Sequence, residues 1–472
     1  MGQMMETRSS HAILGLRHAA SLGAIAIGLA ACTSARPGAP VAPLPSCAIG
    51  AAQAGAGDTL VVATMAPVDR AHVPEPTNAD ERLAFAQAYE TLIDVDCDGR
   101  SRPGLAASWT LDATRTRATL ALRDGARFWS GKPVTVGDVL AAWRATAARP
   151  TPSAQLLRKI VGGTTIVDDH TLIVSLPDTA WLVLASRALA VYEPQSAGAW
   201  PEGSGPYRIV ENSAEAASGA TVLAPSPPSS DPYLVIRRVP NGDPRDAVDA
   251  GADVVVTGDP VAVGYAAALA NLAAVPLPWT RTYVLVVPGV APQIAQVLLR
   301  ADSESVVLRA SLARDAVHSE ARAAQPPYWW DGGRACGAVL DTLPATQAAD
   351  GHSNRVVYRR DDRVARGLAE RLVALDPRTV AAGLAPDDFA RALHDGGDLA
   401  YVLDLPHESL SPCEDFGELR SGAPWLASSV GANARVVPLI DTRETAIVNR
   451  HRVSASVDWS GTLHFGRAGN RP

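Results

Sequence analysis

Residues 87–139 read QAYETLIDVDCDGRSRPGLAASWTLDATRTRATLALRDGARFWSGKPVTVGDV, and this stretch decides the fold. Its middle part has apolar residues in alternation on both sides of a short polar turn, which is typical of two half-buried antiparallel strands. Turn sequences stand at Asp98-Gly99 and Asp124-Gly125. The alternating residues are Trp109 and Leu111 on the first arm, and Ala118, Leu120 and Leu122 on the second.

Helix signals flank this hairpin. Before it, Asn78 is a possible N-cap with Glu81 three residues later, and Phe85, Tyr89 and Leu92 share one face of a helix expected within 78–93. After it, Thr135 and Asp138 have the spacing of a capping box ahead of an apolar helical face. A second hairpin is expected at 166–174. The region from about 95 to 190 therefore resembles a separate, mostly antiparallel unit.

Strands and helices alternate in the rest of the chain. Buried strands are expected at 60–63, 253–256, 282–287 and 399–403. Helical faces come between them and carry Val306, Ala310, Ala313 and Val317, then Val364, Leu368, Leu372 and Leu375, then Phe389 and Leu393. Alternation of strand and helix predicts α/β lobes.

The amino terminus has the pattern of an export signal. A short apolar run at 22–31 follows Arg8 and Arg17 and is about half a membrane span. The residues Leu29-Ala30-Ala31-Cys32 resemble the lipobox of bacterial lipoproteins, which predicts a signal peptide over 1–31 and acylation of Cys32. The alternative is an ordinary secretory signal with an incidental cysteine. Residues 32–57, rich in Ala, Pro, Gly and Ser, are expected to form a flexible linker.

Composition and motifs exclude several function classes. The formal net charge of −7 argues against nucleic-acid binding, which needs a basic surface. The chain has no H-E-x-x-H and no G-x-S-x-G, and acidic pairs such as Asp168-Asp169 and Asp361-Asp362 are interpreted as ordinary carboxylates of turns or helix starts. We therefore expect no enzyme activity, no cofactor and no metal site.

Four cysteines follow the lipobox: Cys47, Cys97, Cys336 and Cys413. An even number in an exported protein favours disulfides, and four cysteines allow three pairings. The chain has no C-x-x-C, and no histidine stands at ligand spacing from these cysteines, so a zinc site is not expected.

Taken in order, the motifs resemble the family 5 extracellular solute-binding proteins of ABC importers, over about residues 58–466. The strongest matches are 87–92, 98–99, 102–106, 108–109, 122–128, 130–135 and 138–139, with support from 203–207, 250–254, 308–314, 437–439 and 458–461. The resemblance implies an α/β fold of the periplasmic-binding-protein type II, a two-lobed clamp with an additional α+β domain. Lobe I would comprise 58–77, 196–275 and 435–472, the additional domain 78–195, and lobe II 276–434.

This resemblance also implies a function. The clamp would close on a peptide or another small polar solute and deliver it to the permease and ATPase subunits of an importer. The protein would be a monomer, held by its lipid in the periplasm or at the cell surface. A second reading is a sensor or scaffold lipoprotein that kept the clamp and lost transport; neighbouring permease genes, or a neighbouring kinase gene, would separate the two.

The family places an amine-capturing aspartate in the second lobe after a Gly-Trp pair, and the matching stretch 401–408 lacks that pair. The predicted ligand-binding residues are Asp404, His407 and Glu408, with Trp329 and Trp330 as a wall and Thr64 at the end of the first strand. With the lobes placed in this way, we predict disulfides between Cys47 and Cys97 and between Cys336 and Cys413, because each pair falls within one lobe or its border.

Overall fold

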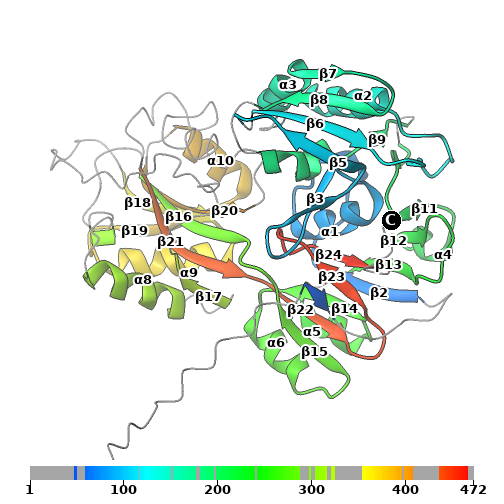
Figure 1. Cartoon of the computed structure of the whole chain (residues 1–472). Helices are drawn as coiled ribbons and strands as arrows, with labels where there is room; N and C mark the ends of the chain where they lie inside the picture. The colour runs from blue at the N-terminus through cyan, green and yellow to red at the C-terminus, as the bar shows by residue number, and fades with distance from the viewer. Residues whose placement is uncertain are drawn as a thin grey trace, which may run out of the picture. The chain divides into compact units, whose positions relative to one another are not determined.

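The structure is a computed structural model that describes residues 47–49, 59–114, 116–149, 151, 154–176, 181–195, 198–239, 242–287, 297–298, 303–315, 320–324, 353–395, 398–407 and 435–465. All of them lie in one compact unit, Pro45–Pro472. The three largest sheets of this described part have seven, six and four strands, and Figure 1 colours them along the chain. None of the described helices is long and apolar enough to cross a membrane.

A seven-stranded mixed sheet forms the first lobe. Its strand order is β11-β12-β13-β2-β14-β22-β15, with β2 parallel to both β13 and β14. Successive residues of β14 point to opposite faces, so Val254 packs in one hydrophobic core and Val255 in the other. The strands are β2 (Thr59–Thr64), β11 (Tyr207–Val210), β12 (Thr221–Pro225), β13 (Tyr233–Arg238), β14 (Val254–Thr257), β15 (Leu272–Pro276) and β22 (Thr445–Asn449).

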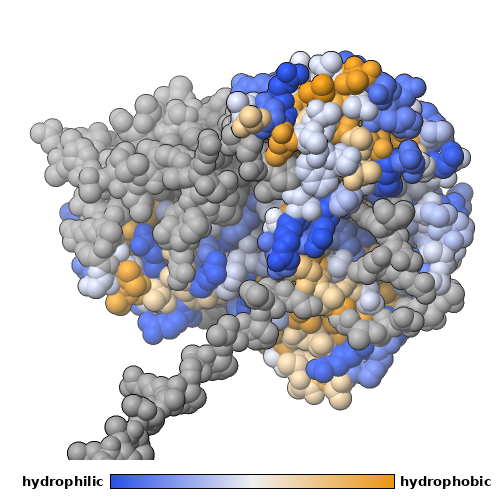
Figure 2. Space-filling model, viewed as in Figure 1, coloured by the Kyte–Doolittle hydropathy of each residue, from blue (hydrophilic) through white to orange (hydrophobic). Residues whose placement is uncertain are grey.

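Helices cover both faces of this sheet. On one face α1 (Ala79–Ala88), which was expected in the additional domain, contributes Phe85 to the core that contains Leu60 and Tyr207 of the first lobe. On the other face α5 (Pro244–Asp249) and α6 (Pro260–Ala267) pack over β14 and β15. Figure 2 shows apolar surface in the region of α6 and β15. The short elements are β1 (Ala48–Ile49), η1 (Arg70–His72), α4 (Ala214–Ala217), β23 (Ala455–Val457) and β24 (Leu463–Phe465).

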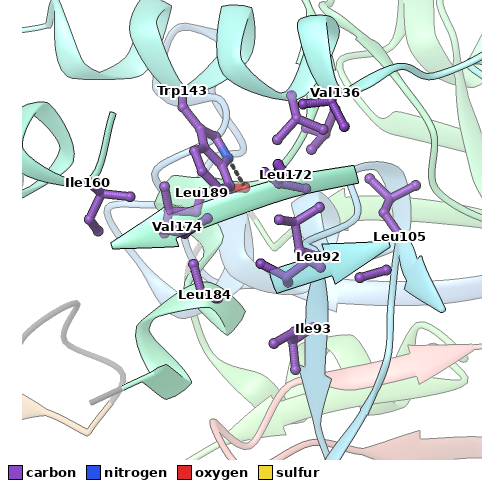
Figure 3. Packing of buried hydrophobic residues seen from close by; sticks show 14 of the residues in the cluster. Leu92, Ile93, Leu105, Val136, Trp143, Ile160, Leu172, Val174, Leu184 and Leu189 are labelled. Atoms are coloured by element: carbon purple, nitrogen blue, oxygen red, sulfur yellow. Dashed lines mark hydrogen bonds between the residues drawn. The ribbon is translucent and has the colours of Figure 1, made fainter. Parts of the chain in front are cut away.

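The additional domain is built on a four-stranded antiparallel sheet in the order β5-β6-β8-β7. Part of its buried hydrophobic cluster is shown in Figure 3, where the indole of Trp143 donates a hydrogen bond of 2.7 Å to the carbonyl of Leu189. The elements are β3 (Ile93–Val95), β4 (Ser101–Pro103), β5 (Ala106–Leu111), β6 (Arg117–Leu122), α2 (Val136–Ala147), α3 (Ala154–Gly162), β7 (Thr164–Ile166), β8 (Thr171–Ser175), η2 (Trp181–Ala185), η3 (Arg187–Leu189), β9 (Tyr192–Glu193) and β10 (Glu202–Gly203).

Both predicted hairpins are present in this domain as β5-β6 and β7-β8, and Thr135 and Asp138 form the predicted capping box. The first helix is shorter than expected. It ends at Ala88, and Tyr89 is already extended, with φ −126° and ψ 126°. The cause is tertiary, because Glu90 is held by two hydrogen bonds from Arg123 and by a bridge to Val191.

A six-stranded sheet in the order β17-β21-β16-β20-β18-β19 forms the second lobe. Its strands are β16 (Arg281–Val287), β17 (Glu320–Ala323), β18 (Ser353–Arg359), β19 (Val380–Leu384), β20 (Asp398–Pro406) and β21 (Arg435–Arg443). The helices α8 (Ser303–Asp315), α9 (Arg363–Val373) and α10 (Pro386–Asp395) contact these strands. Leu312 of α8 and Leu368 of α9 share the core with Val356 of β18.

Two expectations for this lobe need correction. The predicted face of α8 is only partly correct, since Ala313 packs against the core but Val306 is 63% exposed, and the buried residues are Ser305 and Leu312. The predicted start of the last lobe I segment at 435 is also wrong, because β21 pairs with β16 in the second sheet and only β22 pairs in the first. One residue, Glu444, separates β21 from β22, so no sequence break marks the change of sheet.

The chain passes between the two lobes twice. Residues 277–280 join β15 to β16, and Glu444 joins β21 to β22. The two links are hydrogen bonded to each other: the amide of Leu277 donates to the carbonyl of Glu444 at 2.9 Å, and that of Thr280 donates to Thr442 at 3.3 Å. We refer to these paired links between the lobes as the hinge.

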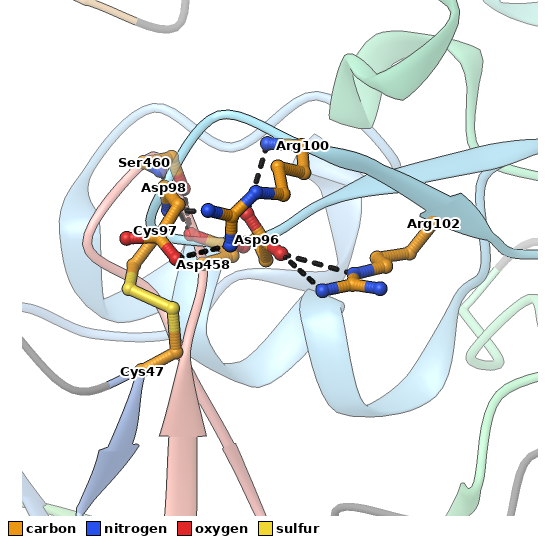
Figure 4. The surroundings of a disulfide bond; sticks show 8 residues. All are labelled: Cys47, Asp96, Cys97, Asp98, Arg100, Arg102, Asp458 and Ser460. Carbon is orange, nitrogen blue, oxygen red and sulfur yellow. Dashed lines mark hydrogen bonds and ion pairs between the residues drawn. A yellow bond between two sulfur atoms is a disulfide. The ribbon is translucent and has the colours of Figure 1, made fainter.

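A disulfide joins Cys47 and Cys97, with Cα atoms 5.5 Å apart (Figure 4). This is the pairing predicted for the border of the first lobe. Next to it, the carboxylate of Asp96 accepts hydrogen bonds from the amide of Arg100 at 2.9 Å and from the guanidinium of Arg102 at 2.9 Å, which fixes the turn. Cys336 and Cys413 lie outside the described residues, as does Cys32.

Candidate functional site

A cavity of about 510 Å³ is lined by residues of both lobes and of the hinge. From the first lobe come Met65, which follows β2, and residues at the ends of β14 and the starts of α5 and α6. From the second lobe come the first residues of β16, the ends of β18 and β20, and the start of α9. The charged lining residues are Asp259, Arg281, Arg359, Asp361, Asp362, Arg363, Asp404, Arg443 and Glu444.

Arg281 and Asp404 form an ion pair on the wall of this cavity. The antiparallel register of β16 and β20 places Tyr283 directly opposite Asp404, and Arg281 two residues away on the same face. Proximity to the Asp404 carboxylate raises the pKa of Arg281 further above its ordinary value. The strand pairing therefore presents a preformed, internally neutral pair to the cavity.

A second acidic group is held beside this pair. The hydroxyl of Tyr283 lies 3.2 Å from each carboxylate oxygen of Asp362. Asp362 is also the N-cap of α9, where it accepts a hydrogen bond of 2.9 Å from the amide of Ala365. Burial raises the pKa of Asp362, and the nearby charge of Asp404 acts in the same direction. The carboxylate is thus fixed in position, and the charge of Asp404 disfavours its ionised form while the charge of Arg359 favours it.

The remaining carboxylate of this loop is already neutralised. Asp361 pairs with Arg359 at 2.6 Å, and this hydrogen bond lowers the pKa of Asp361. Both side chains are about half exposed, so the pair contributes little to stability. Within the described part of the chain, the Asp362 carboxylate forms no ion pair, although the nearby charge of Arg359 acts to lower its pKa.

A smaller cavity of about 150 Å³ adjoins the first and shares Met65, Thr257, Thr280 and Glu444 with it. It contains Asp80, whose carboxylate accepts hydrogen bonds from the amides of Met65 at 3.0 Å and Ala66 at 2.7 Å. Burial raises the pKa of Asp80 to about 6 despite these bonds. Burial also lowers the pKa of the neighbouring Arg82 to about 10.

The predicted ligand-binding residues differ in where they lie. Asp404 lines the larger cavity. His407 does not: it is turned to Thr282, whose hydroxyl lies 2.9 Å from Nε2, and burial lowers the pKa of His407 to about 3. Thr64, the last residue of β2, is buried and lines neither cavity. Glu408, Trp329 and Trp330 lie outside the described residues.

Sequence reasoning missed Arg281, Tyr283 and Asp362. The sequence did contain a signal for the last of these, since Asp361-Asp362 was identified as an acidic pair at a helix start. For Arg281 the only signal was a charged residue at the beginning of an apolar strand. Neither signal is enough to predict a cavity, because the cavity depends on which strands are neighbours in the sheet.

Comparison with known proteins relates the fold of this chain to one family. Residues 101–228 match the family described as bacterial extracellular solute-binding proteins, family 5 Middle. The chain has the fold of a family 5 solute-binding protein. This confirms the resemblance and the fold class predicted from the sequence.

Solved structures of this family share the fold over most of the chain. A putative peptide-binding protein, AppA of Clostridium difficile, superimposes with a TM-score of 0.64 at 14% identity, over 87% of this chain and 100% of that one. A dipeptide-binding protein of Pseudoalteromonas in complex with Met-Leu gives 0.62 at 15% identity, over 86% and 98%. NikA of Brucella suis in complex with Fe(III)-EDTA gives 0.61 at 14%, over 86% and 100%.

A curated relative matches part of this chain. It is described as a probable peptide ABC transporter periplasmic-binding protein of Sinorhizobium fredii, and it is 26% identical over 194 residues. The match covers 39% of this chain and 34% of the relative, so the chain aligns with about a third of that protein's length.

Proposed function

We propose that the chain is the extracytoplasmic solute-binding subunit of an ABC importer and that it holds a peptide or another small polar solute in the 510 Å³ cavity. The observation that carries this proposal is a charged cavity whose walls come from two lobes joined by the paired links 277–280 and 444. Sites built across such a hinge bind their ligand by enclosing it.

The relatives support the substrate class. The curated relative is named for peptide transport, and one of the solved structures holds the dipeptide Met-Leu. The cavity lining suits a polar solute because charged side chains dominate it and Tyr283 is its only aromatic residue among those described. The chemistry is binding alone: a solute that contacts both lobes favours the arrangement in which both contacts are made, and the permease recognises that arrangement.

Export and anchoring complete the proposal. The signal-like residues 1–31 would be removed and Cys32 acylated, so that a monomeric protein is held outside the cytoplasm by its lipid. Changing Cys32 to Ser should release the protein from membranes or leave its signal uncleaved. Correct processing and unchanged membrane attachment of this variant would contradict the anchor.

Filling the cavity tests the binding function. Met65 lines both cavities, so Met65→Trp should obstruct them. Val261 is 61% exposed on α6, and Val261→Trp introduces the same side chain away from the cavity. Thermal-shift screening against dipeptides and small polar solutes should find a compound that stabilises the parent and the Val261 variant and binds Met65→Trp at least tenfold more weakly, about 1.4 kcal/mol. Equal binding by both variants would place the solute elsewhere.

A further inference from the structure

Two arginine–aspartate pairs of the second lobe line the larger cavity. Arg281 of β16 donates a hydrogen bond to the Oδ2 atom of Asp404 on β20. Arg359, at the end of β18, donates to both carboxylate oxygens of Asp361, at 3.1 and 2.6 Å. The pKa of Arg359 is raised chiefly by its hydrogen bond to Asp361 and also by the charge of Asp404, so the two pairs lie near each other. This wall therefore presents guanidinium donors beside carboxylate acceptors and carries no net charge.

Most of the other charged residues of the lining are compensated as well. Asp259 and Asp362 are the N-caps of α6 and α9, where each accepts a hydrogen bond from a backbone amide, at 2.8 and 2.9 Å, and the helix dipole favours a negative charge. Arg443 pairs with Glu320, which lies directly opposite it on β17. Opposite charges remain on the two other described lining residues, Arg363 and Glu444. No strong surplus of either sign is left for a charged solute to neutralise.

A charged group of a solute gains little from a pair of this kind. An ammonium against Asp404 is also repelled by Arg281, and a carboxylate against Arg281 is also repelled by Asp404. Attraction and repulsion follow the same distance law, so they largely offset each other. Binding either charge tightly would require separating the pair and leaving one of its members uncompensated. The pairs therefore select against solutes that depend on ionised groups.

A neutral hydroxyl group fits the same pair. Its hydrogen donates to a carboxylate oxygen and its oxygen accepts from a guanidinium N–H, so it contacts both members without separating them. A carboxylate accepts, and a guanidinium donates, more hydrogen bonds than one such pair uses. Adjacent hydroxyl groups on one carbon skeleton would use this spare capacity, and Tyr283 and Met65, which line the same cavity, offer apolar surface to the carbon atoms.

We propose that the solute is neutral and carries several hydroxyl groups, as a sugar or a cyclic polyol does, and that Arg281 and Asp404 bind these groups as one donor–acceptor unit. This inference rests on the proposed solute-binding function and narrows its class of solute. Solutes with ionised ends, such as free dipeptides, are then weak ligands of this cavity.

Calorimetry with the solute-free parent protein tests the class of solute. The neutral probes are glucose, maltose and myo-inositol. The charged probes are glucosamine, which adds an ammonium to the glucose ring, glucuronate, which adds a carboxylate, and dialanine, which has both. The parent should bind at least one neutral probe, and at least tenfold more tightly than any charged probe. A smaller preference, or no binding by any neutral probe, would overturn the proposal.

Variants of the pair test the residues. The double variant Arg281→Met, Asp404→Asn removes the pair as a unit and leaves no uncompensated charge behind, and it should bind the best neutral probe at least tenfold more weakly. The matched control Arg366→Met, Glu370→Gln removes an exposed pair of α9, with 2.8 Å between its charged groups, that does not line the cavity. It should stay within threefold of the parent. A double variant at Arg281 and Asp404 that binds like this control would overturn the role of the pair.

The single variant Arg281→Met separates a binding role from a structural one. It leaves the Asp404 carboxylate without its guanidinium, so the preference for the best neutral probe over glucosamine should fall at least tenfold. Damage to the fold would weaken both probes alike, and an unchanged preference would overturn the proposal. If dialanine is instead the tightest probe and Met65→Trp abolishes its binding, this inference fails and the solute-binding function stands.

Discussion

Trp279 lies under the guanidinium of Arg443, with 4.6 Å between the guanidinium carbon and the centre of the indole ring. These residues belong to different passages of the chain through the hinge: Trp279 to the link 277–280, and Arg443 to the end of β21 just before Glu444. Arg322 of β17 contacts the same ring at 4.5 Å. The hinge is therefore held by cation–π contacts as well as by backbone hydrogen bonds, and the link carrying Trp279 is attached to the edge of the second lobe.

Replacing Trp279 should loosen this attachment. Trp279→Leu removes two cation–π contacts of roughly 0.5–1 kcal/mol each at partly exposed sites, so the free energy of unfolding should fall by about 1–2 kcal/mol. Trp279→Phe retains a weaker aromatic ring and should lose less. Urea denaturation measures both values. A Leu variant as stable as the Phe variant would show that the ring makes no specific contribution.

Gly461 packs against the same hinge. It has φ +79°, and a Cβ atom there would stand 2.9 Å from the Cγ2 atom of Thr280. Gly99 has nearly the same backbone conformation, φ +77°, with nothing within 4 Å of its Cβ position. Gly99→Ala should therefore cost only the conformational strain, about 1 kcal/mol, and Gly461→Ala should cost more. If urea denaturation shows equal losses in the free energy of unfolding, the side chain of Thr280 moves aside at no cost.

The local elements of this fold were predictable because they depend on residues that are close in sequence. The hairpin around Trp109 and the capping box of Thr135 depend on neighbours in sequence, which a reader of the sequence sees. The end of α1 was not predictable, because Arg123, 33 residues from Glu90, holds the chain extended there. Long-range partners decide where such a helix ends.

The candidate site was predictable only in part for the same reason. Asp404 was found because its stretch resembles the family's. The significance of Arg281 depends on the register between β16 and β20, more than 120 residues apart in sequence, and no local pattern encodes that register. The division between β21 and β22 at Glu444 is equally invisible, since no glycine or proline separates the two strands.

Stability should depend on pH through Asp80. Because burial raises its pKa to about 6 in the folded protein, against an unfolded value near 4, the folded state binds more protons between these pH values. The contribution of Asp80 to the free energy of unfolding should therefore fall as pH rises from about 4 to 6, by at most about 3 kcal/mol, and stay constant above that. Asp80→Asn should remove this slope.

Denaturation of the parent and Asp80→Asn at a series of pH values measures the difference directly. Since other carboxylates titrate in the same range, only the difference between the two proteins is informative. Parallel pH profiles would show that the carboxyl of Asp80 titrates normally in the folded protein.

The Cys47–Cys97 disulfide should contribute to stability. It closes a loop with a sequence separation of 50 residues, for which the chain-entropy model gives about 4 kcal/mol as an upper value. The double variant Cys47→Ala, Cys97→Ala should unfold at lower urea concentration than the oxidised parent, and a reductant should bring the parent toward the variant. An unchanged midpoint on reduction would show that this bond adds nothing to the stability of the folded protein.

Native mass spectrometry of the exported protein, purified without denaturation from the cells that make it, tests the central claim most directly. We predict a population heavier than the polypeptide by the mass of one small polar solute, which is released on unfolding and is strongly reduced in Met65→Trp but retained in Val261→Trp. A parent protein with only the polypeptide mass, and with no small polar solute or dipeptide that binds when added back, would contradict the account.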